Sequence, residues 1–380
     1  MKTYRRIDYV VLATVVGIGV CLFASSGRAA IIDIDAEVST TVQELIDGAP
    51  ASVSSDENQL PDEPENLTIR ASSDLTSTDL SGALVSMGQS ISDFFDPIRL
   101  DQPNPEEFAL EVAAYSNSDS IAYSATSSAG ESRTILFTTE GNPDIPPEID
   151  FGPTNTETIE STFFLSGAVL IWSTDADAGF DETLAQLDVV VSRDGTAGAL
   201  FETAVSITGD ADGGTTVVTD RPIRVERITL DDLAAEGVDQ DSLTVLEGIE
   251  SVGTLVILAI PPQEHVYEYT VTADESLVLT ARLDARIRSG PGGTGVAAAF
   301  GAPFANLATF IEEGLPGVSG QAVQRSINDA TAARAIGRVA DGSGDQTSAA
   351  RLCGVLGVEW VAMSFVGLTL FARRLHKYAS

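Results

Sequence analysis

The chain has 380 residues, a formal net charge of −35 and only two cysteines. Between residues 31 and 350 there are thirteen Arg, no Lys and 54 Asp plus Glu, so the formal charge of this part is 13 − 54 = −41. This charge argues against a nucleic-acid partner, because phosphate binding needs clustered Lys and Arg, and the missing Lys excludes Schiff-base and P-loop chemistry from this part of the chain.

The N-terminus has the three-part pattern of a secretory signal peptide. Basic residues precede an apolar run over residues 9–23, and small residues follow it. We expect residues 1–29 to form the signal peptide and cleavage to occur after Ala29. Two alternatives stay open, an uncleaved N-terminal anchor and lipidation at Cys21.

Cysteine usage restricts the exported part of the chain. Once the signal peptide is removed, Cys353 is the only thiol left. No intrachain disulfide and no Cys-based zinc site can then form. Extracellular domains of eukaryotes are usually stapled by disulfides, so the sequence favours a bacterial host.

Residues 30–104 read as an acidic, partly disordered N-terminal extension. Few aromatic residues, many acids and a Pro-rich segment near residue 62 favour disorder. Within this extension, apolar residues at helical spacing predict a short amphipathic helix over residues 75–95, which prolines then end.

From residue 105 to residue 290 the pattern changes to short β-rich runs separated by turn residues. The clearest runs alternate across a turn at residues 273–275 and predict a hairpin. The fold class we expect is mainly β, an antiparallel β-sandwich or jelly-roll-like ectodomain with short flanking helices and one C-terminal transmembrane helix. Trp172 is expected to pack in its core. The candidate strands are residues 108–115, 120–126, 133–139, 161–172, 187–192, 200–208, 215–219, 223–230, 254–260, 266–272 and 276–287.

Residues 291–350 are expected to form a Gly-rich linker with short helices. The run SGPGGTG predicts a flexible break, and apolar spacing predicts helices over residues 304–313 and 321–339.

Residues 351–380 are expected to be a membrane anchor with a basic tail. The run from Leu352 to Phe371 is almost wholly apolar and long enough to cross a bilayer as a helix. Arg373 and Arg374 follow it, which places the C-terminus in the cytoplasm and the body of the chain outside. Glu359 inside the run is costly in a permanent span and easier to accommodate in a transient one.

The order of these segments resembles bacterial exported surface proteins with a C-terminal sorting signal of the PEP-CTERM/exosortase type. The signal peptide, the acidic β-rich body, the linker and the apolar helix with its Arg-rich end carry the resemblance. The Pro-Glu-Pro triplet is absent, and Arg351-Leu352-Cys353-Gly354 stands in its place. The resemblance implies a surface or extracellular-matrix role, with an envelope sorting protease as partner and Cys353 as a sorting or lipid-attachment site.

Three carboxylates on one expected loop form the best candidate metal site. Asp175, Asp177 and Asp181 supply the hard oxygen ligands that Ca²⁺ prefers, although their spacing is not that of an EF-hand loop. The alternative is a solvated turn. Asp210 and Asp212 in TGDADGGT are weaker candidates for the same chemistry, and a turn is the default interpretation for them.

No catalytic signature accompanies these features. His265 is the only His between residues 31 and 350, and no nucleophile-elbow motif accompanies it. The sequence therefore predicts a non-enzymatic cell-surface or matrix protein, held by one C-terminal span, with an extracellular glycan or protein as ligand. The alternatives are a calcium-dependent adhesion or carbohydrate-binding module and a secreted carbohydrate-active enzyme, whose carboxylate pair leaves no linear signature.

Overall fold

The computed structural model describes residues 29–59, 68–76, 84–93, 108, 110–117, 121–137, 155–175, 179–220, 223–290, 292–301 and 307–340. The chain divides into two units, one of residues 27–332 and one of residues 1–26 with 333–380. The elements described below belong to the first unit, except for the C-terminal end of the last helix.

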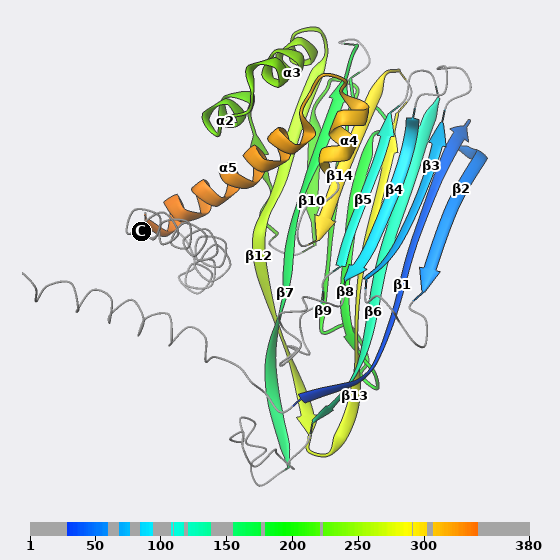
Figure 1. The fold of residues 1–380 in the computed structure, drawn as a ribbon, viewed down its shortest axis with the longest axis vertical. Helices are drawn as coiled ribbons and strands as arrows, with labels where there is room; N and C mark the ends of the chain where they lie inside the picture. Colours follow the sequence, from blue (N-terminus) through cyan, green and yellow to red (C-terminus); the bar gives the residue numbers. More distant parts are fainter. Residues whose placement is uncertain are drawn as a thin grey trace, which may run out of the picture. The chain divides into compact units, whose positions relative to one another are not determined.

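Two seven-stranded sheets, antiparallel throughout, make up most of the first unit (Figure 1). Sheet A has the order β10-β9-β8-β13-β6-β1-β2, and sheet B has the order β11-β12-β7-β14-β5-β4-β3. The strands of sheet A are β1 (Ala29–Ile46), β2 (Ala49–Gln59), β6 (Ala122–Phe137), β8 (Leu184–Arg193), β9 (Phe201–Gly209), β10 (Thr215–Thr219) and β13 (Glu275–Ser289). Those of sheet B are β3 (Thr68–Thr76), β4 (Leu84–Asp93), β5 (Leu110–Asn117), β7 (Thr156–Ser173), β11 (Glu226–Ile228), β12 (Thr254–Thr272) and β14 (Thr294–Gly301).

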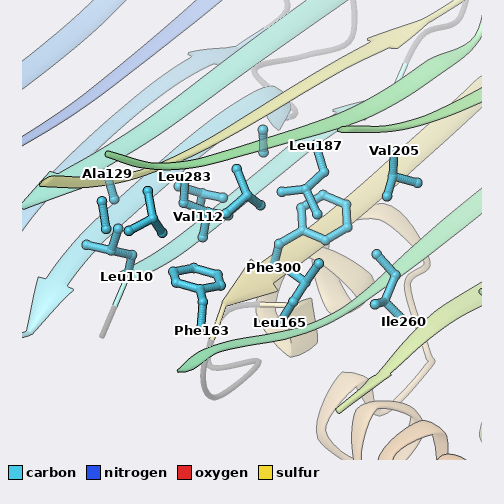
Figure 2. Packing of buried hydrophobic residues seen from close by; sticks show 14 of the residues in the cluster. Leu110, Val112, Ala129, Phe163, Leu165, Leu187, Val205, Ile260, Leu283 and Phe300 are labelled. Carbon is cyan, nitrogen blue, oxygen red and sulfur yellow. The ribbon is translucent and has the colours of Figure 1, made fainter. Parts of the chain in front are cut away.

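One hydrophobic core lies between the two sheets. Alternate residues of most long strands point into it, as the period of two in a strand requires, whereas β2 and β4 contribute none. Figure 2 shows Leu187 and Leu283 of sheet A pointing toward Leu165 and Phe300 of sheet B. These four side chains are at most 2% exposed, so the two layers are held by direct apolar contact.

A second core lies on the other side of sheet B, where helices cover it. The helices are α2 (Leu230–Ala235), α3 (Gln240–Val252), α4 (Leu307–Gly314) and α5 (Gly320–Ala340). Their apolar residues pack on the outward side chains of β5, β7, β12 and β14. Trp172 lies in this core, with Tyr115 and Phe310 in one aromatic row at centroid distances of 6.3 and 6.1 Å. The core role expected for Trp172 is therefore confirmed, and its surroundings are helices as well as a sheet.

Helices α2 and α3 begin at side-chain caps that the sequence analysis missed. Thr229 and Asp232 form a capping box at the start of α2. Asp239 accepts a hydrogen bond from the backbone N–H of Ser242 at 2.8 Å and starts α3.

The disorder expected for the N-terminal extension is wrong for its first thirty residues. Residues 29–59 form β1 and β2, and β1 runs the length of sheet A between β2 and β6. The inward residues of β1 are small or short, with Ala36, Val38 and Val42 all buried. A low overall hydrophobicity therefore concealed a strand whose buried face needs only small side chains.

The helix expected over residues 75–95 is also wrong, because its centre is the strand β4. The inward side chains of β4 include Ser86, Ser90 and Ser92, which are fully buried. Ser90 Oγ donates to the carbonyl of Ser39 at 2.9 Å. Serine on the buried face hid the period of two, and the apolar residues that remained mimicked a helix.

The hairpin expected around residues 273–275 is correct in its strands and wrong in its pairing. β12 ends at Thr272 and β13 begins at Glu275, but β12 pairs with β7 and β11 while β13 pairs with β6 and β8. The turn between them therefore joins the two sheets. Asp274, at φ 61°, donates its N–H to the carbonyl of Phe137 at 2.7 Å, which fixes the crossing.

The Gly-rich linker expected from residue 291 is wrong for residues 294–301, which form β14 in the middle of sheet B. Every residue of β14 is buried. A Cβ at Gly295 would lie 2.1 Å from the Trp172 ring, so only glycine leaves room for it. The helices expected next are confirmed as α4 and α5, and Val323, Ile327 and Ala330 of α5 face inward.

Of the helices that the structure describes, none combines the length and the apolar character that a bilayer crossing demands. The expected anchor over residues 352–371, with Arg373 and Arg374, lies outside the described residues, as does the signal peptide up to residue 28. Ala29 is the first residue of β1.

Candidate functional site

The candidate calcium ligands lie on the connection from β7 to β8. Asp175 and Asp181 are both exposed, and Asp177 between them falls outside the described residues. Asp181 Oδ1 accepts a hydrogen bond from the N–H of Glu182 at 3.1 Å. Within the described part of the chain, no three His, Cys, Asp or Glu side chains are placed to hold a metal ion. The calcium site stays a prediction, which a rise in melting temperature with millimolar Ca²⁺ would check.

The loop that carries Asp210 and Asp212 is a structural turn, as expected. Asp210 Oδ1 accepts from the N–H groups of Asp212 at 3.0 Å and of Gly214 at 2.8 Å. The carbonyl of Asp210 accepts from the N–H of Phe180 at 2.7 Å. The turn therefore anchors the second half of the β7–β8 connection against the end of β9.

His265 belongs to an aromatic row. Its ring stacks on Phe201 with a centroid distance of 5.0 Å, and Phe201 stacks on Phe163 at 6.1 Å. These residues bring β12, β9 and β7 together, so His265 contributes to packing between the two sheets. Cys353 lies outside the described residues.

A charged pair inside the core escaped the sequence analysis. Glu131 and Arg133, both on β6, are 1% and 4% exposed and form an ion pair. The Arg133 guanidinium lies 4.9 Å from the centroid of the Phe108 ring. The pair lies on the inward face of β6 between Ala129 and Ile135, where a charge without a partner would be strongly destabilising. A Glu two residues from an Arg on an otherwise apolar alternation was the signal that could have revealed it.

The outer side of sheet A is a polar surface, and the helix-covered core lies on sheet B. We call this outer side of sheet A the open face; it is centred on the outward residues of β13. Arg282 Nε bonds both oxygens of Asp284 at 3.0 and 2.8 Å, and Arg288 pairs with Glu182 at 2.5 Å. Strand register places rows of short polar side chains beside them. The open face includes Ser39, Thr41, Thr126, Ser128, Gln186, Asp188, Ser206, Arg282, Asp284 and Arg286.

Negative charge gathers on one part of the open face. Partial burial raises the pKa of Asp188, a hydrogen bond from Gln186 opposes that rise, and the charges of Asp284, Asp220 and Glu202 add to it. The pKa of the Arg282 guanidinium is raised, mainly by its bond to Asp284. The open face is therefore a hydroxyl-rich and acidic surface with one line of arginines.

Comparisons with known proteins give no family. No family model matches the chain, and no curated protein matches it. Among solved structures, the T=1 particles derived from infectious bursal virus match with 11% identity and a TM-score of 0.09, over 73% of this chain and 64% of that one. The VP2 subviral particle of infectious bursal disease virus matches with 8% identity and a TM-score of 0.08, over 73% of this chain and 66% of that one.

Proposed function

We propose that this chain is a non-enzymatic protein of the bacterial cell surface or extracellular matrix, tethered by a C-terminal hydrophobic anchor. The observation that carries the proposal is the order of the segments along the chain. An apolar run with basic flanks stands near each end of the sequence, at residues 9–23 and 352–371. Between these runs lies a body built mainly of two antiparallel sheets.

The open face supports a role in binding rather than chemistry. A surface of short polar side chains from several neighbouring strands suits contact with another extended surface, such as a glycan layer or a protein. The helices lie on the opposite side of the body, over sheet B. An extracellular glycan or protein is therefore the ligand class that we assign to the open face.

The architecture belongs to the same proposal. We propose that the two layers form a β-sandwich of the jelly-roll-like kind. Support comes from the chain path, since β5, β6, β7 and β8 alternate between the sheets, and β12, β13 and β14 do so again. Crossing between layers in this way is typical of sandwiches with Greek-key connections.

The test of export uses the native protein and a reporter. Intact-mass analysis of the protein from its host should show a chain that begins at Ala30, and it should show whether the C-terminal tail is cut or modified at Cys353. A reporter enzyme fused after Ala350 should be active outside the cytoplasm. A reporter active only in the cytosol would refute the proposal.

The non-enzymatic part of the proposal has its own test. The full-length protein, offered a panel of glycans and esters, should turn over none of them. Turnover that is abolished by one carboxylate substitution would replace the proposal with a carbohydrate-active or ester-cleaving enzyme.

A further inference from the structure

The four strands that end the two sheets differ in how their outer edges are protected. An edge strand presents unpaired N–H and C=O groups to any other strand, and proteins usually block it with charge, proline, shortness or cover. β2 and β3 end the two sheets on one side of the molecule, and β10 and β11 end them on the other.

Three of these edges are protected. β2 contains Pro50, and its Asp56 and Asn58 side chains bond the β3 backbone, at the N–H of Ser72 (2.9 Å) and the carbonyl of Arg70 (3.3 Å). Side chains of β2 therefore occupy backbone groups of β3. β11 has only three residues and presents almost no edge.

Within the part of the chain that the structure describes, β10 shows none of these devices. Its sequence is TTVVT, without charge, proline or glycine, and among the described strands it pairs with β9 alone. Val217 is 37% exposed and Val218 is 57% exposed. An uncharged five-residue strand of β-branched residues has high strand propensity and no protection against further pairing.

Hydrogen bonds at the two ends of β10 show which of its residues direct their backbone N–H and C=O groups away from β9. Asp210 N–H donates to the carbonyl of Gly214 at 3.0 Å, and Asp220 N–H donates to the carbonyl of Ala204 at 3.2 Å. In an antiparallel ladder the bonded pairs alternate. Residues 216 and 218 therefore bond β9, and Thr215, Val217 and Thr219 direct their backbone groups to the open edge.

We propose that a second copy of this chain pairs with the open edge of β10, strand to strand and antiparallel, about a two-fold axis at Val217. In this register Val217 lies opposite Val217 of the second copy, and Thr215 lies opposite Thr219. Thr215, Val217 and Thr219 then each lie opposite a residue whose backbone groups also face the shared edge. Each such pair exchanges two backbone hydrogen bonds. On the outer face, Thr216 lies opposite Val218, which is a favourable β-branched pair.

The choice of a second copy rests on this self-match and on charge. A two-fold contact needs a surface that complements itself, and TTVVT does so at its central residue. In a chain of net charge −35, these five neutral residues form a place where two copies can approach. Asp212 and Asp220 flank the strand and repel across the axis, so the dimer should become tighter as salt screens them.

The first experiment measures the mass of the full-length protein in a non-ionic detergent by sedimentation, at about 0.05 M and about 0.5 M NaCl. We expect a concentration-dependent dimer that tightens at the higher salt concentration. A monomer at every concentration and both salt concentrations would overturn the proposal. Because the measurement needs only the purified protein, its outcome is independent of the proposed cell-surface role.

Substitutions in β10 then locate the contact. Val217→Pro removes an outward N–H that β9 does not use, and it should weaken the dimer at least about ten-fold, with the circular-dichroism spectrum retained. If the proline perturbs folding, Val218→Asp adds a charge at an exposed position and should give the same loss. A dimer unchanged by Val218→Asp in a folded protein would place the interface elsewhere and refute the proposal.

Cross-linking tests the axis itself. In a Cys21→Ser, Cys353→Ser background, Val217→Cys places two thiols on residues about 5.5 Å apart between Cα atoms, within the range for a disulfide. Mild oxidation should give a covalent dimer joined between the two copies of residue 217. The control, Val53→Cys on the exposed edge strand β2, should form no covalent dimer under the same oxidation; equal cross-linking at both positions would contradict the proposed register.

Discussion

The two sheets differ in how their outer sides are covered, and the burial patterns of their strands differ accordingly. In sheet B, the half of β7 from Leu165 to Ser173 and the half of β12 from Leu255 to Pro261 are buried at every residue, because helices cover one side and sheet A covers the other. In sheet A, β13 alternates strictly between buried and accessible residues from Leu277 to Ser289. A strand covered on both sides reads as a continuous apolar run, and a strand with one open side reads as an alternation.

The same comparison holds within single strands. β12 is continuously buried at its start, where described helices pack on Leu255, Ile257 and Ala259, and it alternates from Val266 to Thr272, beyond those contacts. β7 shows the reverse order, alternating first and buried later. The burial pattern along each covered strand therefore shows which part of that strand lies under the helices.

The largest expected effect is on the covered side. Trp172→Ala should lower the free energy of unfolding by about 3–5 kcal/mol, because it empties a site that is 1% exposed between sheet B and α4. The matched variant on the open face, Thr126→Ala, should change it by no more than about 0.5 kcal/mol. Urea unfolding of both variants provides the comparison, and equal losses would show that the open face is covered in solution.

The inward face of sheet A should respond almost as strongly. Glu131→Leu removes the carboxylate that pairs with the buried Arg133 guanidinium and should cost about 3–5 kcal/mol. The double variant Glu131→Leu, Arg133→Met should recover most of this loss. If the double variant is as unstable as the single one, the pair acts through shape and not through charge.

The contact between α4 and sheet B gives an intermediate effect. A Cβ at Gly314 would lie 2.6 Å from Tyr115 Cε2 and 2.7 Å from Trp172 Cζ2. Gly314→Ala must therefore move α4 and should cost about 1–3 kcal/mol by overpacking. Gly248→Ala in α3 is the control, since a Cβ there meets no atom within 4 Å; it should leave stability unchanged or raise it by up to about 1 kcal/mol.

The smallest effect is a pH dependence on the open face. The pKa of Asp188 is raised in the folded state, so its ionised form disfavours folding. The stability linked to this raised pKa is fully present when the pH is below the pKa of Asp188 in the unfolded chain. It is lost as the pH rises through the pKa of Asp188 in the folded protein. Asp188→Asn should therefore stabilise the protein at neutral pH, by no more than about 0.5 kcal/mol because the group is largely solvated, and the gain should vanish in acid.

Thermal unfolding at several pH values measures this difference. Glu57→Gln on β2, at the far end of the same sheet, should show no comparable gain at neutral pH. A gain of the same size in both variants would indicate general charge reduction and not the local environment of Asp188.

Some parts of the candidate site depend on residues close together in the sequence, and others depend on residues that only the fold brings together. The turn at Asp210 and Asp212 was predicted, since its hydrogen bonds lie within five residues. The acidic part of the open face was not, because Asp188, Glu202, Asp220 and Asp284 come from three strands and a strand end that only the sheet order brings together. The pairing of Glu131 with Arg133 was local, but its burial depended on sheet B.

The sequence alone determined that the chain is mainly β, that helices follow near residues 307 and 320, and that Trp172 is buried, because these features follow from local periodicity and residue type. Only the tertiary structure decided that the chain crosses between sheets after Thr272, that β4 turns serines inward and that β14 is the centre of sheet B. The physical reason is that a strand's pattern records which of its faces are buried. It does not record which strand lies beside it or how much room the facing layer leaves.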